Sequence, residues 1–235
     1  MEFTKPRRLH AGDTVAVLSM SWAGAAAFPH VFEAGVSTLT DRLGLRVQEY
    51  PTTRASANGA PVDPRLRAAD MNAAFADDAV AAIVATIGGD DSARILPHLD
   101  ADLIRANPKV LMGYSDTATQ LVFCHSLGLV TFNGPAVMAG LAQLGHFPLA
   151  EAHLRAMLFE PANSLHYRPA PQWVDSYADW TEPGNAHQVG ALHPHDGWHW
   201  LNGSGSRSGR LFGGCIEVLE FLKGSRFWPA DDYEE

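Results

Sequence analysis

The sequence predicts an α/β protein with a doubly wound parallel sheet. In the first 145 or so residues, short apolar runs alternate with longer segments of helical spacing, which is the pattern of strands covered by helices. Right-handed crossovers between such strands place helices on both faces of the sheet. The composition, 46% hydrophobic and 18% charged over 235 residues, excludes disordered, collagenous and disulfide-scaffold proteins and allows one large domain or slightly more.

Five short segments predict the strands of this sheet. They are the runs at residues 15–18, 80–87, 109–112 and 129–132 and the strand-like segment at 45–49. The run at 80–87 is apolar without alternation, as expected for a strand covered on both faces. Helical spacing predicts helices at residues 28–43, 65–75, 92–99, 117–127 and 135–144. Gly44 supplies a helix stop and Pro64 a helix start. Ligands of such a fold bind beyond the carboxyl ends of the strands, so those loops hold the candidate site.

The chain becomes irregular between residues 160 and 190, where four prolines interrupt it. We predict an α/β domain at 1–160, a linker at 161–189 and a partial β-rich C-terminal domain at 190–235. Short strands are expected at 188–192, 198–201 and 210–212, followed by a helix at 215–222. The last unit is small for an independent core, so the second domain is predicted to be incomplete.

The charge balance argues against nucleic acid as a partner. The 17 basic and 26 acidic residues give a net charge of −9, whereas binding to phosphate backbones needs clustered Lys and Arg. No apolar run approaches ~18 residues and the N-terminus lacks a signal-peptide pattern, so we expect a cytoplasmic protein without a membrane partner. Cys124 and Cys215 lack metal-binding spacing, and no phosphate-cradling glycine motif is present, so neither metal nor cofactor is expected.

The segment from Lys109 to Thr117 resembles a nucleophile elbow. A predicted strand runs into Gly-Tyr-Ser-Asp and then into a helix, which would present Ser115 at the helix start with the amide of Asp116 pointing toward an oxyanion. Asp116 and Thr117 depart from the usual pattern, which has a second glycine there. The alternative is that Ser115 or Asp116 only caps the helix.

A second loop, from Ile87 to Ser92, places two glycines directly after a buried strand. Because sequential strands are commonly neighbours in this topology, the loop can lie beside Ser115. Gly88 and Gly89 would then offer their amides to a tetrahedral oxyanion, and one such donor contributes about 2.7 to 4 kcal/mol to the transition state. A tight turn capped by aspartate and a nucleotide-phosphate loop are the alternatives.

A serine nucleophile also needs a base, and the sequence offers none at a suitable position. His125 lies ten residues after Ser115 on the same predicted helix, about 15 Å away at 1.5 Å per residue. The histidine-rich segment 193–199 could supply a base or metal ligands, or it could be a polar hairpin loop. Glu217 lies in an apolar run and could orient an imidazole, or it could face solvent at a helix start.

Three motifs together resemble one family. The stretches 87–92 (Ile-Gly-Gly-Asp-Asp-Ser), 113–117 (Gly-Tyr-Ser-Asp-Thr) and 213–219 (Gly-Gly-Cys-Ile-Glu-Val-Leu), in this order and separation, are similar to the LD-carboxypeptidase family of serine peptidases. The microcin C immunity-type branch is the most similar. The resemblance implies a flavodoxin-like N-terminal domain joined to a β-rich C-terminal domain, a homodimer, and no metal.

The resemblance also implies roles for individual residues. Ser115 would be the nucleophile, and Glu217 would be the acid member of a Ser-His-Glu triad. The amides of Gly89 and Asp116 would form the oxyanion hole. The residues expected to contact substrate are Gly88, Asp90 and Trp180. Trp180 or Trp173 could stack on a purine, although each could instead pack the linker onto a domain.

Members of the family hydrolyse the amide bond between an L-centre and a D-amino acid in murein tetrapeptides, or the acyl bond of aminoacyl-nucleotide antibiotics. The segment 215–219 is more similar to the second group. The family's histidine belongs to a Gly-His-Thr type segment, and the sequence ends at Glu235 before any such segment. We therefore expect a truncated hydrolase whose turnover falls on the order of a millionfold, or a noncatalytic ligand-binding relative.

Overall fold

The structure is a computed structural model that describes residues 2–199, 201–203 and 205–229. Its central sheet has five parallel strands, β1 (Thr14–Leu18), β2 (Arg46–Glu49), β3 (Val80–Ala85), β4 (Val110–Gly113) and β5 (Phe132–Asn133). Their order is β2-β1-β3-β4-β5, which is the flavodoxin-like order with a topological switch point between β1 and β3. The predicted doubly wound parallel sheet is confirmed.

Two hydrophobic clusters explain why the strands are apolar without alternation. Successive side chains of a strand point to opposite faces, so each of the central strands β1, β3 and β4 contributes to both clusters. One cluster takes alternate residues of the central strands, including Val15, Val17, Ala82, Val84 and Met112. The other takes the residues between them, including Ala16, Leu18, Ile83, Ala85 and Leu111. Burial on both faces is what the run at 80–87 predicted.

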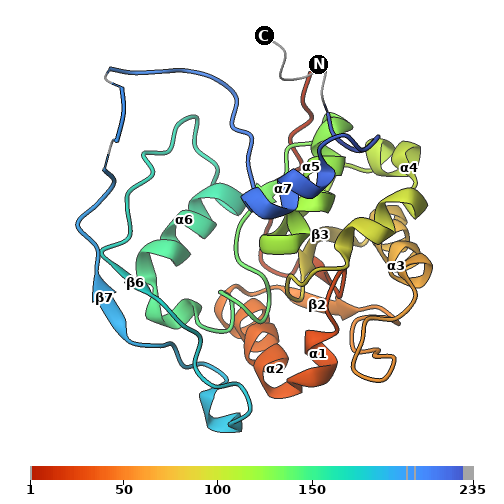
Figure 1. Cartoon of the computed structure of the whole chain (residues 1–235), viewed down its shortest axis with the longest axis horizontal. Helices are drawn as coiled ribbons and strands as arrows, with labels where there is room; N and C mark the ends of the chain where they lie inside the picture. The colour runs from red at the N-terminus through yellow and green to blue at the C-terminus, as the bar shows by residue number, and fades with distance from the viewer. Residues whose placement is uncertain (1, 200, 204, 230–235) are drawn as a thin grey trace.

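The helices surround this sheet (Figure 1). They are α1 (Gly24–Ala27), α2 (Pro29–Ser37), α3 (Pro64–Ala76), α4 (Ala101–Ala106), α5 (Ala118–Ser126), α6 (Pro148–Leu158) and α7 (Ile216–Leu222). The predicted start at Pro64 is confirmed, because Asp63 caps α3 by accepting a hydrogen bond from the amide of Arg65 at 2.8 Å. Helix α2 continues into a π-helical turn at Thr38–Arg42, and Ser92–His98 forms a 3₁₀ helix.

The predicted helix at 135–144 is wrong. The segment is a series of buried turns, and the amides of Val137 and Met138 donate to the carbonyls of Ala85 and Thr86, both at 2.9 Å. The end of β3 therefore satisfies backbone groups that a helix would have satisfied internally. Helix α6 begins later, at Pro148, and was not predicted, and neither was α4. The fifth strand is also shorter than expected, because Leu129 makes only an isolated bridge to Thr4.

Beyond α6, the chain forms a small antiparallel sheet from β6 (Gln172–Val174) and β7 (Leu192–Pro194), with Trp173 opposite His193. The strand predicted at 188–192 is displaced to β7, and Val189 makes only an isolated bridge. The strands predicted at 198–201 and 210–212 are absent from the described residues, because no neighbouring strand pairs with them there, and Trp200 lies outside those residues. The predicted helix at 215–222 is confirmed as α7.

Candidate active site

Ser115 occupies a sharp turn between the carboxyl end of β4 and the start of α5. Its φ is +58°, a left-handed conformation that costs a residue with a Cβ about 1–3 kcal/mol. Gly113 makes the turn possible, because a Cβ there would lie 2.7 Å from the side chain of Thr117 and 2.9 Å from that of Ala85. A half-buried serine with this geometry at the strand-to-helix junction has the form of a nucleophile elbow.

The diglycine turn lies directly against this serine, as the sequence predicted. A Cβ on Gly88 would stand 2.9 Å from the Cβ of Ser115, 3.0 Å from its Oγ and 3.3 Å from the amide nitrogen of Asp116. Gly89 has a φ of +149°, which favours glycine. Among the described residues, neither glycine amide donates a hydrogen bond to a protein acceptor. Gly88 and Asp116 therefore flank Ser115, and Gly89 follows immediately in the same turn.

A buried polar layer lies beneath the two turns. The carboxylate Oδ2 of Asp116 accepts hydrogen bonds from Ser21 Oγ at 2.5 Å and from the amide of Ser92 at 2.8 Å. The main-chain carbonyl of Asp116 accepts a bond from Ser92 Oγ at 2.7 Å. All three residues are buried. The side chain of Asp116 thus belongs to the support of the site, whereas its amide is the part that adjoins Ser115.

Arg67 from α3 places a positive charge in the same layer. Its side chain is 1% exposed, and it pairs with the carboxylate of Asp91. It also donates to the carbonyl of Met20 at 2.8 Å. Such a buried guanidinium is tolerated because a carboxylate and several carbonyls satisfy it. Asp90, by contrast, is exposed at the tip of the diglycine turn, where a bound molecule could reach it.

Aromatic residues connect the elbow to the segment that follows β6. The hydroxyl of Tyr114, the residue before Ser115, lies 2.7 Å from that of Tyr177. Burial, followed by this hydrogen bond, raises the pKa of Tyr114. The ring of Tyr177 lies 5.3 Å from that of Trp180, which also meets Phe28 edge to face at 5.8 Å. Trp180 Nε1 is buried without a hydrogen-bond partner among the described residues, whereas Trp173 packs on His193 in the hairpin.

Helix α7 carries Glu217 and packs against α5, as Figure 1 shows. The approach is close, because a Cβ on Gly214 would lie 2.8 Å from the Cβ of Ala118, three residues after Ser115. The carboxylate of Glu217 is exposed and accepts a hydrogen bond from the thiol of Cys215 at 3.0 Å, which lowers the pKa of Glu217. No recorded contact joins Glu217 to Ser115, so its triad role stays a prediction.

The histidines considered as bases lie elsewhere. His125 lies in the last turn of α5 and contacts the rings of Phe3 and Phe212 at 4.5 and 5.6 Å between centroids. In the hairpin region, His193 lies 3.4 Å from the carboxylate of Asp175. No histidine of the described chain hydrogen-bonds to Ser115. Across those same residues, no group of three histidine, cysteine or acidic side chains is arranged to hold a metal ion.

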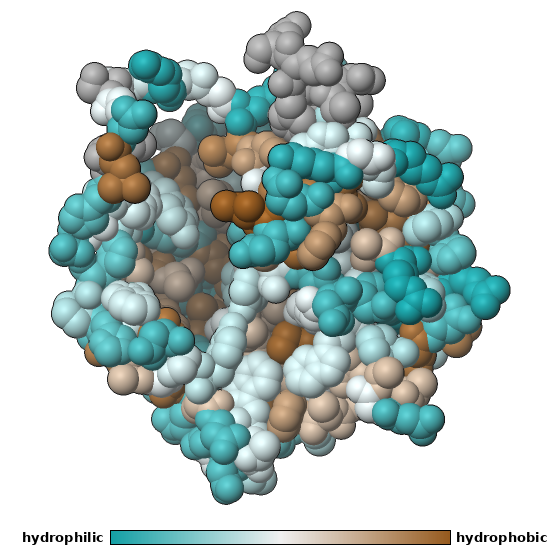
Figure 2. Space-filling view, viewed as in Figure 1, coloured by the Kyte–Doolittle hydropathy of each residue, from teal (hydrophilic) through white to brown (hydrophobic). Residues whose placement is uncertain are grey.

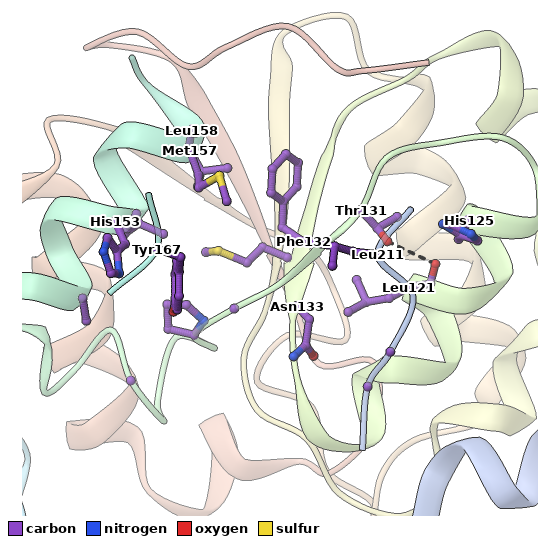
Figure 3. Close-up of a pocket in the computed structure, with 18 of the residues that line it drawn as sticks. Leu121, His125, Thr131, Phe132, Asn133, His153, Met157, Leu158, Tyr167 and Leu211 are labelled. Carbon is purple, nitrogen blue, oxygen red and sulfur yellow. Dashed lines mark hydrogen bonds between the residues drawn. The ribbon is translucent and has the colours of Figure 1, made fainter. Parts of the chain in front are cut away.

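A large apolar cavity that the sequence did not predict lies beside the edge strand β5. Its volume is about 520 Å³, and α5, α6 and residues 211–214 surround it. Figure 2 shows the hollow between hydrophobic surfaces. Figure 3 shows Phe132 and Met157 facing into it, with His153 and Tyr167 on one side. The rings of His153 and Tyr167 are stacked, with 4.2 Å between their centroids. Gly134 joins the cavity wall to the elbow, because its amide donates to the carbonyl of Gly113 at 3.0 Å.

Sequence reasoning missed Ser21, Arg67 and Tyr177. Ser21 follows the first predicted strand, so its place at the carboxyl edge of the sheet was a usable signal. Arg67 and Tyr177 carried no such signal, because both reach the site only through tertiary packing. Within the part of the chain that is described, no helix is long and apolar enough to cross a bilayer.

A comparison with protein families adds to this geometry. Residues 15–134 match the model of the LD-carboxypeptidase N-terminal domain. The matched range contains β1 except for its first residue, together with the diglycine turn and the elbow that carries Ser115. The chain belongs to the LD-carboxypeptidase family. The predicted resemblance to this family is therefore confirmed, and the matched range contains the first two of the three motifs.

Individual relatives of the family agree. A carboxypeptidase relative from Vibrio cholerae is 30% identical over 227 residues, which cover 95% of this chain and 66% of that protein. The microcin C7 self-immunity protein MccF of Escherichia coli is 30% identical over 231 residues, covering 94% of this chain and 64% of that protein. A murein peptide carboxypeptidase relative from Bacillus subtilis is 31% identical over 157 residues, or 66% of this chain and 48% of that protein.

Solved structures of this family have the same fold. MccF without ligand superimposes with a TM-score of 0.84 at 29% identity, over 95% of this chain and 67% of that chain. MccF has also been solved in complex with aspartyl sulfamoyl adenosine, with a TM-score of 0.83 to this chain. The chain spans just under two thirds of the length of the Vibrio cholerae relative and of MccF. The family match and the carboxypeptidases among the relatives support a peptidase-type function for the family.

Proposed function

We propose that this chain is a serine hydrolase that cleaves an amide or acyl bond in an aminoacyl-nucleotide or an LD-peptide. The observation that carries the proposal is the left-handed conformation of Ser115 at the carboxyl end of β4, with Gly88 in contact with its side chain. A strained residue persists only where its surroundings hold it, and strain of this kind is concentrated at functional sites. We further propose a cytoplasmic homodimer, with no nucleic-acid or membrane partner and no metal or cofactor.

The proposed chemistry is acyl transfer. A general base takes the hydroxyl proton of Ser115 as Oγ attacks the carbonyl carbon of the substrate. The oxyanion of the resulting tetrahedral intermediate accepts hydrogen bonds from the amides of Gly89 and Asp116. The carbon–nitrogen bond then breaks, and the leaving nitrogen takes up the proton that the base carries. Water hydrolyses the resulting serine ester and releases the acid. Glu217 is proposed as the acid member that orients the base, and no residue of this chain is assigned as the base itself.

The proposed substrate class rests on the aromatic residues. Trp180 is linked to the elbow through Tyr177 and Tyr114, and its indole N–H is buried without a hydrogen-bond partner among the described residues. A purine stacked on an indole contributes about 1–3 kcal/mol of binding. The MccF complex with aspartyl sulfamoyl adenosine supports the same class of ligand. Gly88 and the exposed Asp90 are proposed to contact the reacting end of the substrate.

A second function is ligand binding without turnover. It is favoured by one observation, namely that Glu217 accepts a bond from Cys215 and no described histidine bonds to Ser115. Such a protein would keep the pocket and lack the base, which lowers turnover on the order of a millionfold. It would then sequester its ligand stoichiometrically.

The two functions are separated by one experiment on the chain and its Ser115→Ala variant. Each is mixed with aspartyl sulfamoyl adenosine or with a murein tetrapeptide, and cleavage is followed by chromatography while binding is measured by calorimetry. The hydrolase predicts cleavage that the Ser115→Ala variant lacks, with binding retained. Binding without cleavage by both proteins supports the second function. Equal cleavage by both proteins would show that Ser115 is not the nucleophile.

A further inference from the structure

Three loops meet at the carboxyl edge of the sheet. The carboxylate of Asp116 lies in one of these loops and accepts hydrogen bonds from the other two. The loops follow the neighbouring strands β1, β3 and β4, and contribute Ser21, Ser92 and Asp116 respectively. Oδ2 of Asp116 accepts a bond from Ser21 Oγ at 2.5 Å and another from the amide of Ser92 at 2.8 Å. Ser21 Oγ also joins the three loops, because it donates to Asp116 and accepts a bond from the amide of Asp91 at 3.2 Å.

In the hydrogen bonds that join Asp116 to Ser21 and Ser92, the oxygens of Asp116 are the acceptors and the two serines are the donors. The amide of Asp91 donates to Ser21 Oγ at 3.2 Å, and Ser21 Oγ in turn donates to Asp116. Ser92 Oγ donates to the carbonyl of Asp116 at 2.7 Å. Ser21 and Ser92 are fully buried and Asp116 is 5% exposed, so water does not compete for these groups. The carboxylate therefore holds Ser92, at the end of the diglycine turn, and Ser21, in the loop that packs against Gly89.

The position of Gly89 depends on this arrangement. A Cβ on Gly89 would lie 2.4 Å from Ser21 Oγ and 2.7 Å from the amide nitrogen of Trp22, so the backbone of the glycine rests directly on the loop that Asp116 holds. The amide of Asp116 adjoins Ser115, whose left-handed φ also needs support from its surroundings. Both proposed oxyanion donors thus depend on one side chain.

We propose that the carboxylate of Asp116 is a positioning residue for the oxyanion hole, because it fixes Ser21 and Ser92 and so sets the separation between the Gly89 amide and its own. This inference rests on the proposed hydrolase function and adds a role that the amide of Asp116 does not have. The carboxylate acts through these neighbours and does not touch the substrate. Removing it should therefore reduce turnover much more than it weakens substrate binding.

The chain offers a closely matched control in Asp70. Oδ2 of Asp70 also accepts two bonds on one oxygen, from the amide of Thr52 at 2.7 Å and from Thr52 Oγ1 at 2.6 Å. Asp70 is 8% exposed and none of its recorded contacts reaches the elbow or the diglycine turn. Asp116→Ala and Asp70→Ala therefore remove the same kind of interaction, one beneath the site and one elsewhere.

The kinetic test measures kcat and KM for Asp116→Ala, Asp116→Asn and Asp70→Ala on the substrate that the wild type cleaves. We expect Asp116→Ala to lower kcat about 10²–10³-fold, the effect of losing one oxyanion donor, with KM changed only a few-fold. Asp116→Asn should recover kcat to within about tenfold of wild type, because its amide oxygen can accept both bonds. Asp70→Ala should lower the melting temperature and leave kcat unchanged. Equal kcat losses in the two alanine variants would overturn the proposal.

A structural test of the positioning role does not need turnover. If the wild type shows no turnover, that result refutes the proposed hydrolase function but not the positioning role. Crystal structures of Asp116→Ala and Asp70→Ala are compared with the wild type. We expect Ser115 to leave its positive φ, or Gly89 to move off Ser21, in the first variant only. If both stay in place in Asp116→Ala, the positioning role is refuted. If Asp116→Ala does not fold, Ser21→Ala removes one of the two donors and is judged by the same criteria.

Discussion

The hydroxyl groups of Tyr114 and Tyr177 lie 2.7 Å apart, although 63 residues separate them in the sequence. Tyr114 immediately precedes the strained Ser115, and Tyr177 contacts Trp180. The pair therefore joins the turn that carries the proposed nucleophile to the segment proposed to hold the substrate. Motion of one part is coupled to the position of the other through this bond.

The Tyr177→Phe variant should bind ligand more weakly. It leaves the hydroxyl of Tyr114 without its partner and releases the segment near Trp180, at a cost of about 0.5–1.5 kcal/mol. Calorimetric titration with aspartyl sulfamoyl adenosine should show Kd raised by about two- to tenfold. The control is Tyr50→Phe, which loses a hydroxyl that accepts a bond from Gln48 at 3.1 Å. The same increase in Kd in both variants would contradict the link.

Replacing Trp180 should distinguish a stacking residue from a packing residue. We expect Trp180→Ala to weaken the binding free energy of the same nucleoside ligand by about 1–3 kcal/mol, which raises Kd roughly five- to 150-fold. The matched variant is Trp173→Ala, whose ring is 47% exposed and packs on His193 in the hairpin. Its Kd should equal that of the wild type. A larger loss of affinity in Trp173→Ala would transfer the stacking role to that residue.

Gly88→Ala should block the site without unfolding the protein. Its new Cβ would stand 2.9 Å from the Cβ of Ser115 and 3.0 Å from Oγ, so the serine would have to shift. We expect at least a hundredfold loss of kcat/KM, comparable with the loss of one oxyanion donor. Gly184→Ala serves as control, because no atom lies within 4 Å of its Cβ position. Full activity in Gly88→Ala would mean that the turn does not constrain Ser115.

The stability of the protein should depend on Glu151 at neutral pH and less so in acid. Burial tends to raise the pKa of Glu151, but hydrogen bonds from Arg42 at 2.6 Å and Arg155 at 2.9 Å lower it overall from 4.5. A carboxylate whose pKa is lowered by folding stabilises the fold at pH values above its pKa in the unfolded state. This contribution is lost as the pH falls through its pKa in the folded state. Urea unfolding of Glu151→Gln should show a deficit at neutral pH that shrinks below pH 4.5. A deficit independent of pH would contradict this assignment.

Local patterns predicted the sheet and the elbow. All five parallel strands were predicted. The central strands β1, β3 and β4 had the clearest signal, because strands buried on both faces have a composition that few other segments share. Gly113 and Ser115 predicted the elbow, because a tight strand-to-helix turn restricts which residues fit. The helix predicted at 135–144 failed because a buried turn and a buried helix are equally apolar, and only contact with β3 distinguishes them.

The sequence by itself determined which segments are buried strands, where the diglycine and Gly-Tyr-Ser-Asp turns fall, and to which family the chain is similar. These features depend on side chains near one another along the chain, so they can be read locally. Only the tertiary structure decided that Asp116 joins Ser21 to Ser92, that Arg67 lies beneath the site, and that Tyr177 meets Tyr114. Such partners are brought together by the packing of strands and helices. A short sequence pattern does not indicate which residue, distant in the sequence, will make the contact.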